Sequence, residues 1–207
     1  TPALSSAASD VYKRQTKVIA VSDFSEKILG KNLDKTKIKV IYNGIDINRF
    51  KNFKQKNTKC LNKDLSLLTV GSLSKRKGQH NVIRALPEIK KYFPEVRYNM
   101  VGPDNIKKEL IDLAKSLGVE DSVKFYGYLE DNELSVLFEQ SDLFLMLSEN
   151  LPDGDIEGFG IAILEANYFG LPAIGSTGCG IENAISNMKT GVLVDNKNPI
   201  ECREAIE

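Results

Sequence analysis

The sequence predicts an α/β protein built on a doubly wound, Rossmann-like parallel sheet. Six short apolar runs alternate with segments whose apolar residues recur at helical spacing, which is the pattern of parallel strands joined by helical crossovers. The chain has 207 residues, of which 42% are hydrophobic and 27% charged, so it can bury one substantial core like an ordinary globular protein. Two polar, glycine-containing motifs follow predicted strands, which is where ligands bind in such sheets.

The first 64 residues divide into a leader and a connecting part. Residues 1–15 have no periodicity and many small side chains, so we expect a foreign or disordered leader outside the fold. Residues 16–64 are interpreted as the end of a preceding domain and an interdomain linker. They contain predicted strands at 17–21 and 39–42, a helix at 26–32 capped by Ser22 or Ser25, and a polar, lysine-rich stretch of weak structure at 48–64.

Residues 65–207 form the predicted sheet domain. We expect its strands at residues 65–70, 97–101, 123–126, 143–147, 173–175 and 191–194. The helices between them are expected at residues 79–92 with a kink at Pro87, at 106–117, around 134–138 with Asp131 as cap, and at 161–169. A last helix is expected from Pro199 to Glu207, and we expect the domain to continue beyond it.

The charge and cysteine content argue against several classes of function. Lysine plus arginine and aspartate plus glutamate number 28 each, so no net charge favours nucleic-acid binding. No apolar run reaches the roughly 18 residues that a membrane span needs. The three cysteines are far apart and His80 is the single histidine, which indicates reduced thiols in a cytoplasmic protein and no metal site.

The segment EGFGIAILE, which starts at Glu157, is the most informative motif of the chain. If a helix starts near Gly160, Glu165 lies on its second turn and Glu157 lies in the loop before it. The free N–H groups of Phe159, Gly160 and Ile161 would then point out of the helix start, where an anion is stabilised. A carboxylate on each side of an anion site suits a nucleotide sugar, which carries hydroxyls on both sides of a diphosphate.

A second motif, GSLSKRKG, starts at Gly71 directly after the first strand of the sheet domain. It places Lys75, Arg76 and Lys77 in one loop at the carboxyl end of that strand. A lysine ammonium and an arginine fork can together neutralise a diphosphate. The alternative is a solvated basic turn, because runs of like charge usually lie on the surface.

Both motifs resemble those of the family 4 glycosyltransferases, which are retaining enzymes with the two-domain GT-B architecture. The two glutamates match the family's E-x(7)-E motif, and the basic loop resembles its G-R-L-x-x-x-K-G loop. Lys77 matches the family lysine, whereas Ser72 stands where the family usually has arginine, and Arg76 would supply that cation. The resemblance extends from about residue 16 to residue 207, so the chain would be the C-terminal, donor-binding half, without its acceptor-binding N-terminal domain.

The resemblance implies a role for each matching residue. Glu157 would contact hydroxyls of the transferred sugar, Glu165 would hold the ribose, and Arg76 and Lys77 would neutralise the diphosphate. The candidate catalytic residues are therefore Glu157, Lys77 and Arg76. The candidate substrate-binding residues are Gly71, Ser72, Tyr126, Gly127, Tyr128, Leu129, Phe159, Gly160, Ile161 and Glu165.

Two further segments resemble parts of the family's donor site. Residues 125–129 resemble the segment that lines the nucleobase pocket, largely through backbone contacts. Residues 175–182 resemble a glycine-rich loop that closes near the donor sugar. The alternatives are plain packing of Tyr126 and Tyr128 at a strand end, and a flexible loop without a ligand.

The resemblance implies transfer of a hexose-type sugar, with retention, from a UDP-, GDP- or ADP-sugar to a glycan or lipid-linked acceptor, without a cofactor or metal. The implied setting is polysaccharide or lipopolysaccharide biosynthesis at the inner membrane surface, with any membrane contact made by the missing half. The chain alone would bind donor without turnover. One alternative is a non-catalytic nucleotide-sugar-binding or interaction module, which Ser72 favours. Others are a sugar-nucleotide epimerase, which matches the phosphate loop less well, and a nicotinamide dehydrogenase, whose glycine fingerprint is missing.

Overall fold

The computed structural model describes residues 15–50 and 64–207, and within them a six-stranded sheet forms the centre of the fold. All neighbouring strands are parallel, in the order β5-β4-β3-β6-β7-β8. The strands are β3 (Ser66–Val70), β4 (Arg97–Val101), β5 (Val123–Gly127), β6 (Leu143–Met146), β7 (Ala173–Ser176) and β8 (Gly191–Val194). The order reverses direction between β3 and β6, which confirms the predicted doubly wound sheet.

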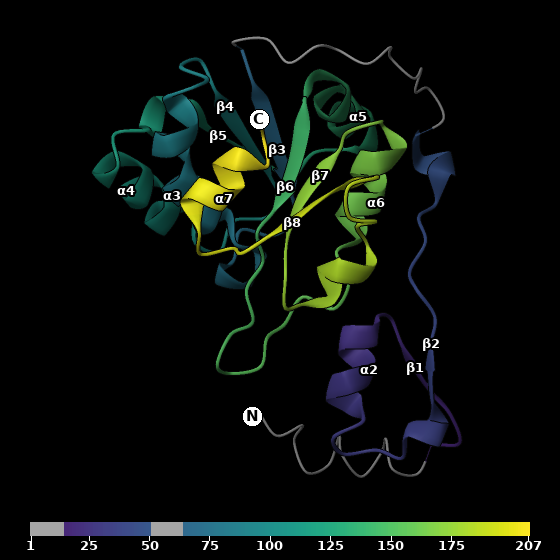
Figure 1. Ribbon diagram of the computed structural model, residues 1–207. Coiled ribbons are helices and arrows are strands. Elements are labelled where there is room, and N and C mark those ends of the chain that lie inside the picture. The colour runs from purple at the N-terminus through teal and green to yellow at the C-terminus, as the bar shows by residue number, and fades with distance from the viewer. Residues whose placement is uncertain (1–14, 51–63) are drawn as a thin grey trace.

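Helices cover both faces of this sheet, as Figure 1 shows. One face carries α3 (Gln79–Lys90), α4 (Lys107–Ser116) and α7 (Pro199–Glu204), and the other carries α5 (Asp131–Gln140) and α6 (Ile161–Tyr168). Each face has its own cluster of buried apolar side chains, the first around Ile83 and Leu145 and the second around Phe138 and Phe144. The central strands are therefore buried on both sides, which is why their sequences are continuous apolar runs.

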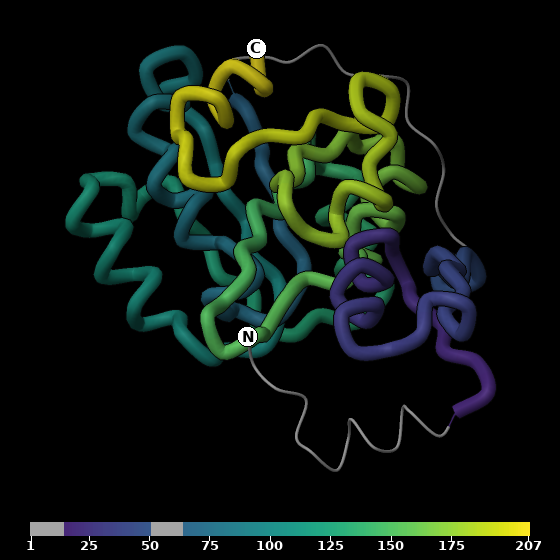
Figure 2. Tube along the Cα trace, turned by 60° about the horizontal axis from the view of Figure 1, so that its bottom comes forward, coloured from purple at the N-terminus to yellow at the C-terminus, as the bar shows by residue number. Residues whose placement is uncertain are grey.

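A small βαβ unit precedes the large sheet. The strands β1 (Val18–Ala20) and β2 (Ile38–Val40) pair in parallel, with α2 (Asp23–Leu29) between them and the short turn η1 (Lys35–Lys37) before β2. Ser22 caps α2 by accepting a hydrogen bond from the Ser25 N–H, as predicted. The unit contacts the large sheet domain through Asn183, whose side chain bonds Asp23 and Tyr42. Figure 2 shows α2 lying against this part of the chain.

The connecting segment after β2 has more structure than its composition predicts. Residues Ile47–Phe50 form the 3₁₀ turn η2, and Phe50 is buried against α5 and α6. The polar side chains around it gave no apolar period, so the prediction of weak structure was wrong at this turn. Residues 51–63 of the predicted linker, and the predicted leader apart from Gln15, lie outside the described residues.

Three predicted helix ends differ from the structure. The cap of α5 is Glu130, which forms a capping box with Glu133, and not Asp131. Asp131 is not available as a cap because its carboxylate is bound by Arg49. The helix expected at residues 26–32 ends at Leu29, and the last helix ends at Glu204, short of residue 207.

We expect Phe50→Ala to lower the free energy of unfolding by about 3–5 kcal/mol, because the ring packs against Phe138, Tyr168 and Phe169. Urea unfolding followed by circular dichroism measures this change. Ile47→Ala in the same turn is the control, since Ile47 is 53% exposed and its loss should cost less than about 0.5 kcal/mol. Equal losses in the two variants would show that the segment does not dock through Phe50.

Candidate functional site

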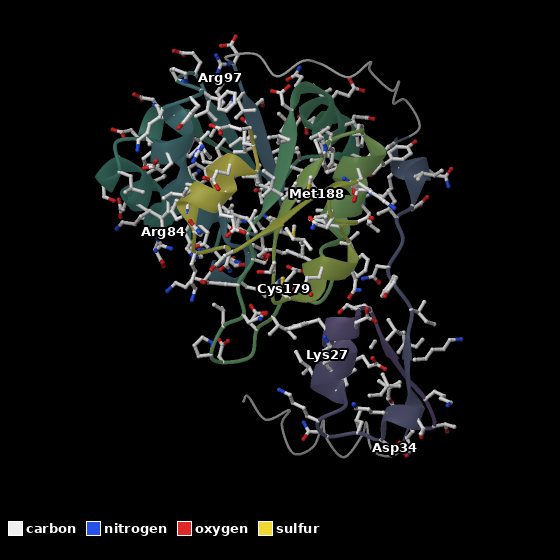
Figure 3. The ribbon with its side chains drawn as sticks, viewed as in Figure 1. Lys27, Asp34, Arg84, Arg97, Cys179 and Met188 are labelled. Atoms are coloured by element: carbon white, nitrogen blue, oxygen red, sulfur yellow. The ribbon has the colours of Figure 1, made fainter. Side chains whose placement is uncertain are left out.

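Three loops meet at the carboxyl edge of the sheet, the loops after β3, β6 and β7, and the loop after β6 carries Glu157. The loop after β3 packs backbone to backbone on the loop after β6, because a Cβ added to Gly78 would lie 1.8 Å from the Leu147 carbonyl oxygen. The loop after β7 packs likewise on the Glu157 loop, since a Cβ on Gly180 would lie 2.0 Å from the Gly158 oxygen. In Figure 3, Cys179 marks this edge and Arg97 marks the opposite, amino edge.

Glu157 lies at the centre of this edge and pairs with both cations of the basic loop. Its side chain is 8% exposed, and its Oε2 accepts from Arg76 Nη1 at 2.5 Å and lies 2.7 Å from Lys77 Nζ. Arg76 Nε also lies 2.8 Å from Asp155 Oδ1, without hydrogen-bond geometry. The structure thus brings together the three candidate catalytic residues Glu157, Arg76 and Lys77. Within the described residues, Oε1 of Glu157 accepts no hydrogen bond, so it can meet a ligand hydroxyl.

The basic loop is a single 3₁₀ turn, η3 (Lys75–Lys77), that ends at Gly78. Gly71 donates its N–H to the Val101 carbonyl, and the Ser72 carbonyl accepts from the Gln79 side chain. Gly71 and Ser72 therefore shape the loop through their backbones, and the cations come from its far end. Ser72 supplies no cation, and it is Arg76 that places a guanidinium beside Glu157.

The start of α6 directly follows the loop that carries Glu157, and its first backbone N–H groups are a further part of the candidate site. Gly160 is the N-cap with φ of 89°, a left-handed conformation that favours glycine. Within the described part of the chain, the N–H groups of Phe159, Gly160 and Ile161 donate no hydrogen bond. Phe159 is buried and Ile161 is about half exposed. These three N–H groups are therefore unpaired within the described residues, and their role in anion binding remains a prediction.

Several buried polar atoms around the basic loop have no hydrogen-bond partner. Within the described ranges these atoms are Ser74 Oγ, Arg76 Nε, His80 Nδ1 and Ser148 Oγ. Each comes from the basic loop, the helix that follows it, or the end of β6. Of these atoms, Arg76 Nε still has an ionic partner, because it lies 2.8 Å from Asp155 Oδ1.

Glu165, the second predicted acid, is held by residues that the sequence did not point to. Its Oε1 accepts from Arg49 Nη1 at 2.7 Å, and Arg49 also forms a two-pronged pair with Asp131. The hydrogen bonding from Arg49 to Asp131 lowers the pKa of the Asp131 carboxyl. The Arg49–Glu165 pair spans 116 residues of sequence, and no local pattern could have revealed it.

The predicted base-pocket segment lies at the end of β5. Gly127 has φ of 68°, and Tyr128 is 73% exposed beyond it, while Leu129 packs with the core on the α5 face. The Tyr126 ring lies under Lys124 Nζ at 4.5 Å. Tyr126 also lines a cavity of about 400 Å³, but Ser66 and Arg97, which begin β3 and β4, line it as well, so this cavity lies at the amino edge of the sheet, away from the motifs. The backbone role of this segment remains a prediction.

The remaining polar candidates have structural roles. Burial lowers the pKa of His80 in spite of Glu149, whose carboxylate lies 3.2 Å from the His80 Nε2. Burial also raises the pKa of the Cys179 thiol, which contacts Ser176. In the glycine-rich loop, the Gly178 carbonyl accepts from Asn150, a contact that links this loop to the loop after β6.

Among the described residues, no group of histidine, cysteine, aspartate and glutamate could hold a metal ion. No helix in the described ranges is both long and apolar enough to cross a membrane. The expectations of a metal-free reaction and of a cytoplasmic location remain predictions.

Comparisons with known proteins agree on one family. The family model described as glycosyl transferases group 1 matches residues 49–207. The amylovoran biosynthesis glycosyltransferase AmsK of Erwinia amylovora is 29% identical over 170 residues, covering 82% of this chain and 41% of AmsK. A GDP-mannose-dependent alpha-(1-6)-phosphatidylinositol monomannoside mannosyltransferase of Mycobacterium tuberculosis H37Rv is 31% identical, covering 68% of this chain and 37% of that enzyme. The chain thus spans less than half the length of these relatives.

Solved structures agree with this relationship. Anabaena Alr3699/HepE in complex with UDP and glucose has a TM-score of 0.78 at 27% identity, covering 97% of this chain and 55% of that one. WaaG, a glycosyltransferase involved in lipopolysaccharide biosynthesis, has a TM-score of 0.72 at 24% identity, covering 92% of this chain and 53% of WaaG, and supports the fold alone. These neighbours confirm the predicted fold class, the sheet domain of GT-B glycosyltransferases.

We expect Gly180→Ala to destabilise the protein by about 1–3 kcal/mol, because the new methyl group would force the Glu157 loop away from the loop after β7. Thermal unfolding measures the loss. Gly44→Ala is the matched control, since nothing lies within 4 Å of its added Cβ. An unchanged melting temperature for Gly180→Ala would contradict the close packing of these two loops.

Proposed function

This chain belongs to the family of glycosyl transferases group 1, and from that premise we propose that it forms the donor site of a retaining family 4 glycosyltransferase. The observation that carries the proposal is the cluster of Arg76 and Lys77 on Glu157, beside the open start of α6. Two cations and a helix N-terminus at the carboxyl edge of a doubly wound sheet form a site for a diphosphate. Glu157 and Glu165 flank it, as the sugar and ribose of a nucleotide sugar require.

The ion pairs of Glu157 hold the two cations of the basic loop in place. Arg76 and Lys77 both contact one oxygen of Glu157, so the carboxylate holds them where phosphate oxygens would lie. An arriving diphosphate offers them more negative charge, and its oxygens can also accept from the N–H groups of Phe159 to Ile161. Glu157 is then released to accept hydrogen bonds from hydroxyls of the donor sugar.

In the proposed reaction, the bond between the sugar C1 and the diphosphate oxygen breaks, and a bond from C1 to an acceptor oxygen forms on the same face. The leaving phosphate oxygen takes the acceptor proton. Arg76, Lys77 and the α6 start stabilise the charge that develops on the diphosphate, which is the main catalytic need of the transfer. A covalent intermediate on Glu157 is not required. No metal or other cofactor takes part, because these groups balance the charge.

The comparisons support the classes of donor and acceptor that we propose. Alr3699/HepE was solved with UDP-glucose, and the mycobacterial relative uses GDP-mannose, so the donor is a UDP- or GDP-sugar, with an ADP-sugar as the third choice. AmsK is a glycosyltransferase of amylovoran biosynthesis, which supports our proposal of a glycan or lipid-linked acceptor. The location at the inner membrane surface stays a prediction. The matched part of this chain covers only 41% and 37% of these relatives, so we propose that the acceptor site lies in the other half and that this chain alone does not turn over.

A second candidate function is a nucleotide-sugar-binding module without catalysis. Ser72 favours it, because one phosphate-loop arginine of the resembling family is replaced. The position of Arg76 favours the enzyme, since it places a guanidinium beside Glu157 all the same. Transfer activity in a chain extended to the length of its relatives separates the two functions.

We expect one of UDP, GDP and ADP to bind the chain in calorimetric titration, and Glu165→Ala to weaken it by about 10- to 150-fold. This factor corresponds to the loss of hydrogen bonds to a charged group, about 1.5–3 kcal/mol. Lys77→Ala should weaken binding of the nucleoside diphosphate but not binding of the free nucleoside. Lys115→Ala, which removes an exposed lysine in the last turn of α4, is the control for general loss of positive charge. A folded chain that binds none of the three nucleotides would refute the proposed donor site.

In the extended chain, we expect the product to keep the anomeric configuration of the donor, as read from the anomeric coupling by NMR. Glu157→Gln should lower kcat more than it raises KM, because Glu157 contacts the reacting sugar. Inversion at C1 would exclude a family 4 mechanism. A glycosylated Glu157 peptide in mass spectrometry would replace the direct proton transfer with a covalent route.

A further inference from the structure

Arg49 joins three separate elements beside the proposed ribose site. It lies in η2, and its guanidinium donates from Nε and Nη2 to the two oxygens of Asp131 at 3.2 and 2.6 Å. Its Nη1 donates to Glu165 Oε1 at 2.7 Å. Asp131 is the first residue of α5, and Glu165 lies in the second turn of α6. One side chain of the connecting segment therefore fixes the separation of two helix starts at the carboxyl edge.

Phe50, the next residue in the chain, packs its ring against the Arg49 guanidinium. The guanidinium carbon lies 5.2 Å from the centre of the Phe50 ring. Phe50 is 2% exposed, among aromatic rings of α5 and α6. The connecting segment runs beside α6 in Figure 1. Because the buried Phe50 anchors the backbone of η2, the Arg49 side chain extends to Glu165 from a backbone that is held in place.

The pairing leaves the Glu165 carboxylate usable. An ionised carboxylate can accept about four hydrogen bonds, and Arg49 takes one of them on Oε1. Within the described residues, Oε2 accepts none. A vicinal diol can donate one hydrogen bond to each oxygen of a carboxylate. The ribose hydroxyls can therefore bind Glu165 while Arg49 stays in place.

The same pairing supplies the charge that Glu165 needs. Its side chain is 9% exposed, and an isolated buried carboxylate is costly unless it is paired. Arg49 meets two carboxylates at once because its planar fork presents several donors in a fixed geometry. A lysine at this position would keep the charge, but its single ammonium could not hold both partners in the same geometry.

We propose that Arg49 is a positioning residue for ribose recognition, which holds the Glu165 carboxylate oriented with one oxygen open to the nucleotide diol. The proposal rests on the proposed donor site. The contact is to the ribose side of the ligand, so it acts equally on any base and it requires the 2′- and 3′-hydroxyls.

The test compares the binding of UDP, GDP or ADP, whichever the chain binds best, with the binding of its 2′,3′-dideoxy form. We expect the wild-type chain to prefer the ribonucleotide, and Arg49→Ala to weaken the ribonucleotide by about tenfold while the dideoxy form changes less than about twofold. Arg49→Lys should recover part of the preference. Asp131→Asn, which removes a charge but leaves the Arg49–Glu165 contact, should give a smaller loss than Arg49→Ala.

Arg97→Ala is the matched control, because Arg97 is an exposed arginine at the opposite edge of the sheet (Figure 3). Equal weakening of the ribonucleotide and the dideoxy form by Arg49→Ala would overturn the proposal, since it would show a general structural role. Unchanged binding of both forms in Arg49→Ala would overturn it as well. If Arg49→Ala does not fold, an unaltered ribose preference in Arg49→Lys and Asp131→Asn overturns it. A wild-type chain that binds no nucleotide would instead refute the donor site itself.

Discussion

Close packing of loop backbones at the carboxyl edge of the sheet is the constraint on which the site depends. Gly78 lies against the beginning of the loop after β6, and Gly180 lies against the later part of the same loop, at Glu157 and Gly158. The cations Arg76 and Lys77 directly precede Gly78, so their side chains start from a backbone that is fixed against its neighbour. A side chain at either glycine would separate the loops, and the distances of 2.5 and 2.7 Å that join the cations to Glu157 could not both be kept.

The charged side chains of the candidate site are paired with one another. Each predicted acid holds at least one cation, Glu157 with Arg76 and Lys77, and Glu165 with Arg49. Such pairs are costly to break without a substitute, because they would leave charges with little exposure and no partner. A diphosphate is such a substitute for Glu157, since it offers several oxygens in its place. Glu165 differs because its open oxygen allows a ligand to bind without the loss of its arginine.

The amino-terminal residues complete this site and do not merely precede it. Phe50 inserts into the aromatic cluster of α5 and α6, and this contact brings Arg49 to Glu165. On the other side, Asp23 of α2 bonds Asn183, and Ser25 donates to the Gly158 carbonyl. The Glu157 loop is therefore contacted by α2, and the Glu165 helix by η2. The small βαβ unit and η2 belong to one continuous segment, so this segment contacts the elements that carry both acids.

The sequence by itself determined the parallel sheet, the alternation of strands and helices along the chain, and the two motifs. Continuous apolar runs give buried strands, and the eight-residue spacing of Glu157 and Glu165 places both acids at one helix start, so these features depend on neighbours in the chain. Only the tertiary structure decided that Arg76 meets Glu157, that Glu130 and not Asp131 caps α5, and that Arg49 holds Glu165. The Arg76–Glu157 and Arg49–Glu165 contacts join side chains 81 and 116 residues apart, and they exist because packing of the whole sheet and its helices sets the distance between elements. A hydrophobic period carries no information about that distance.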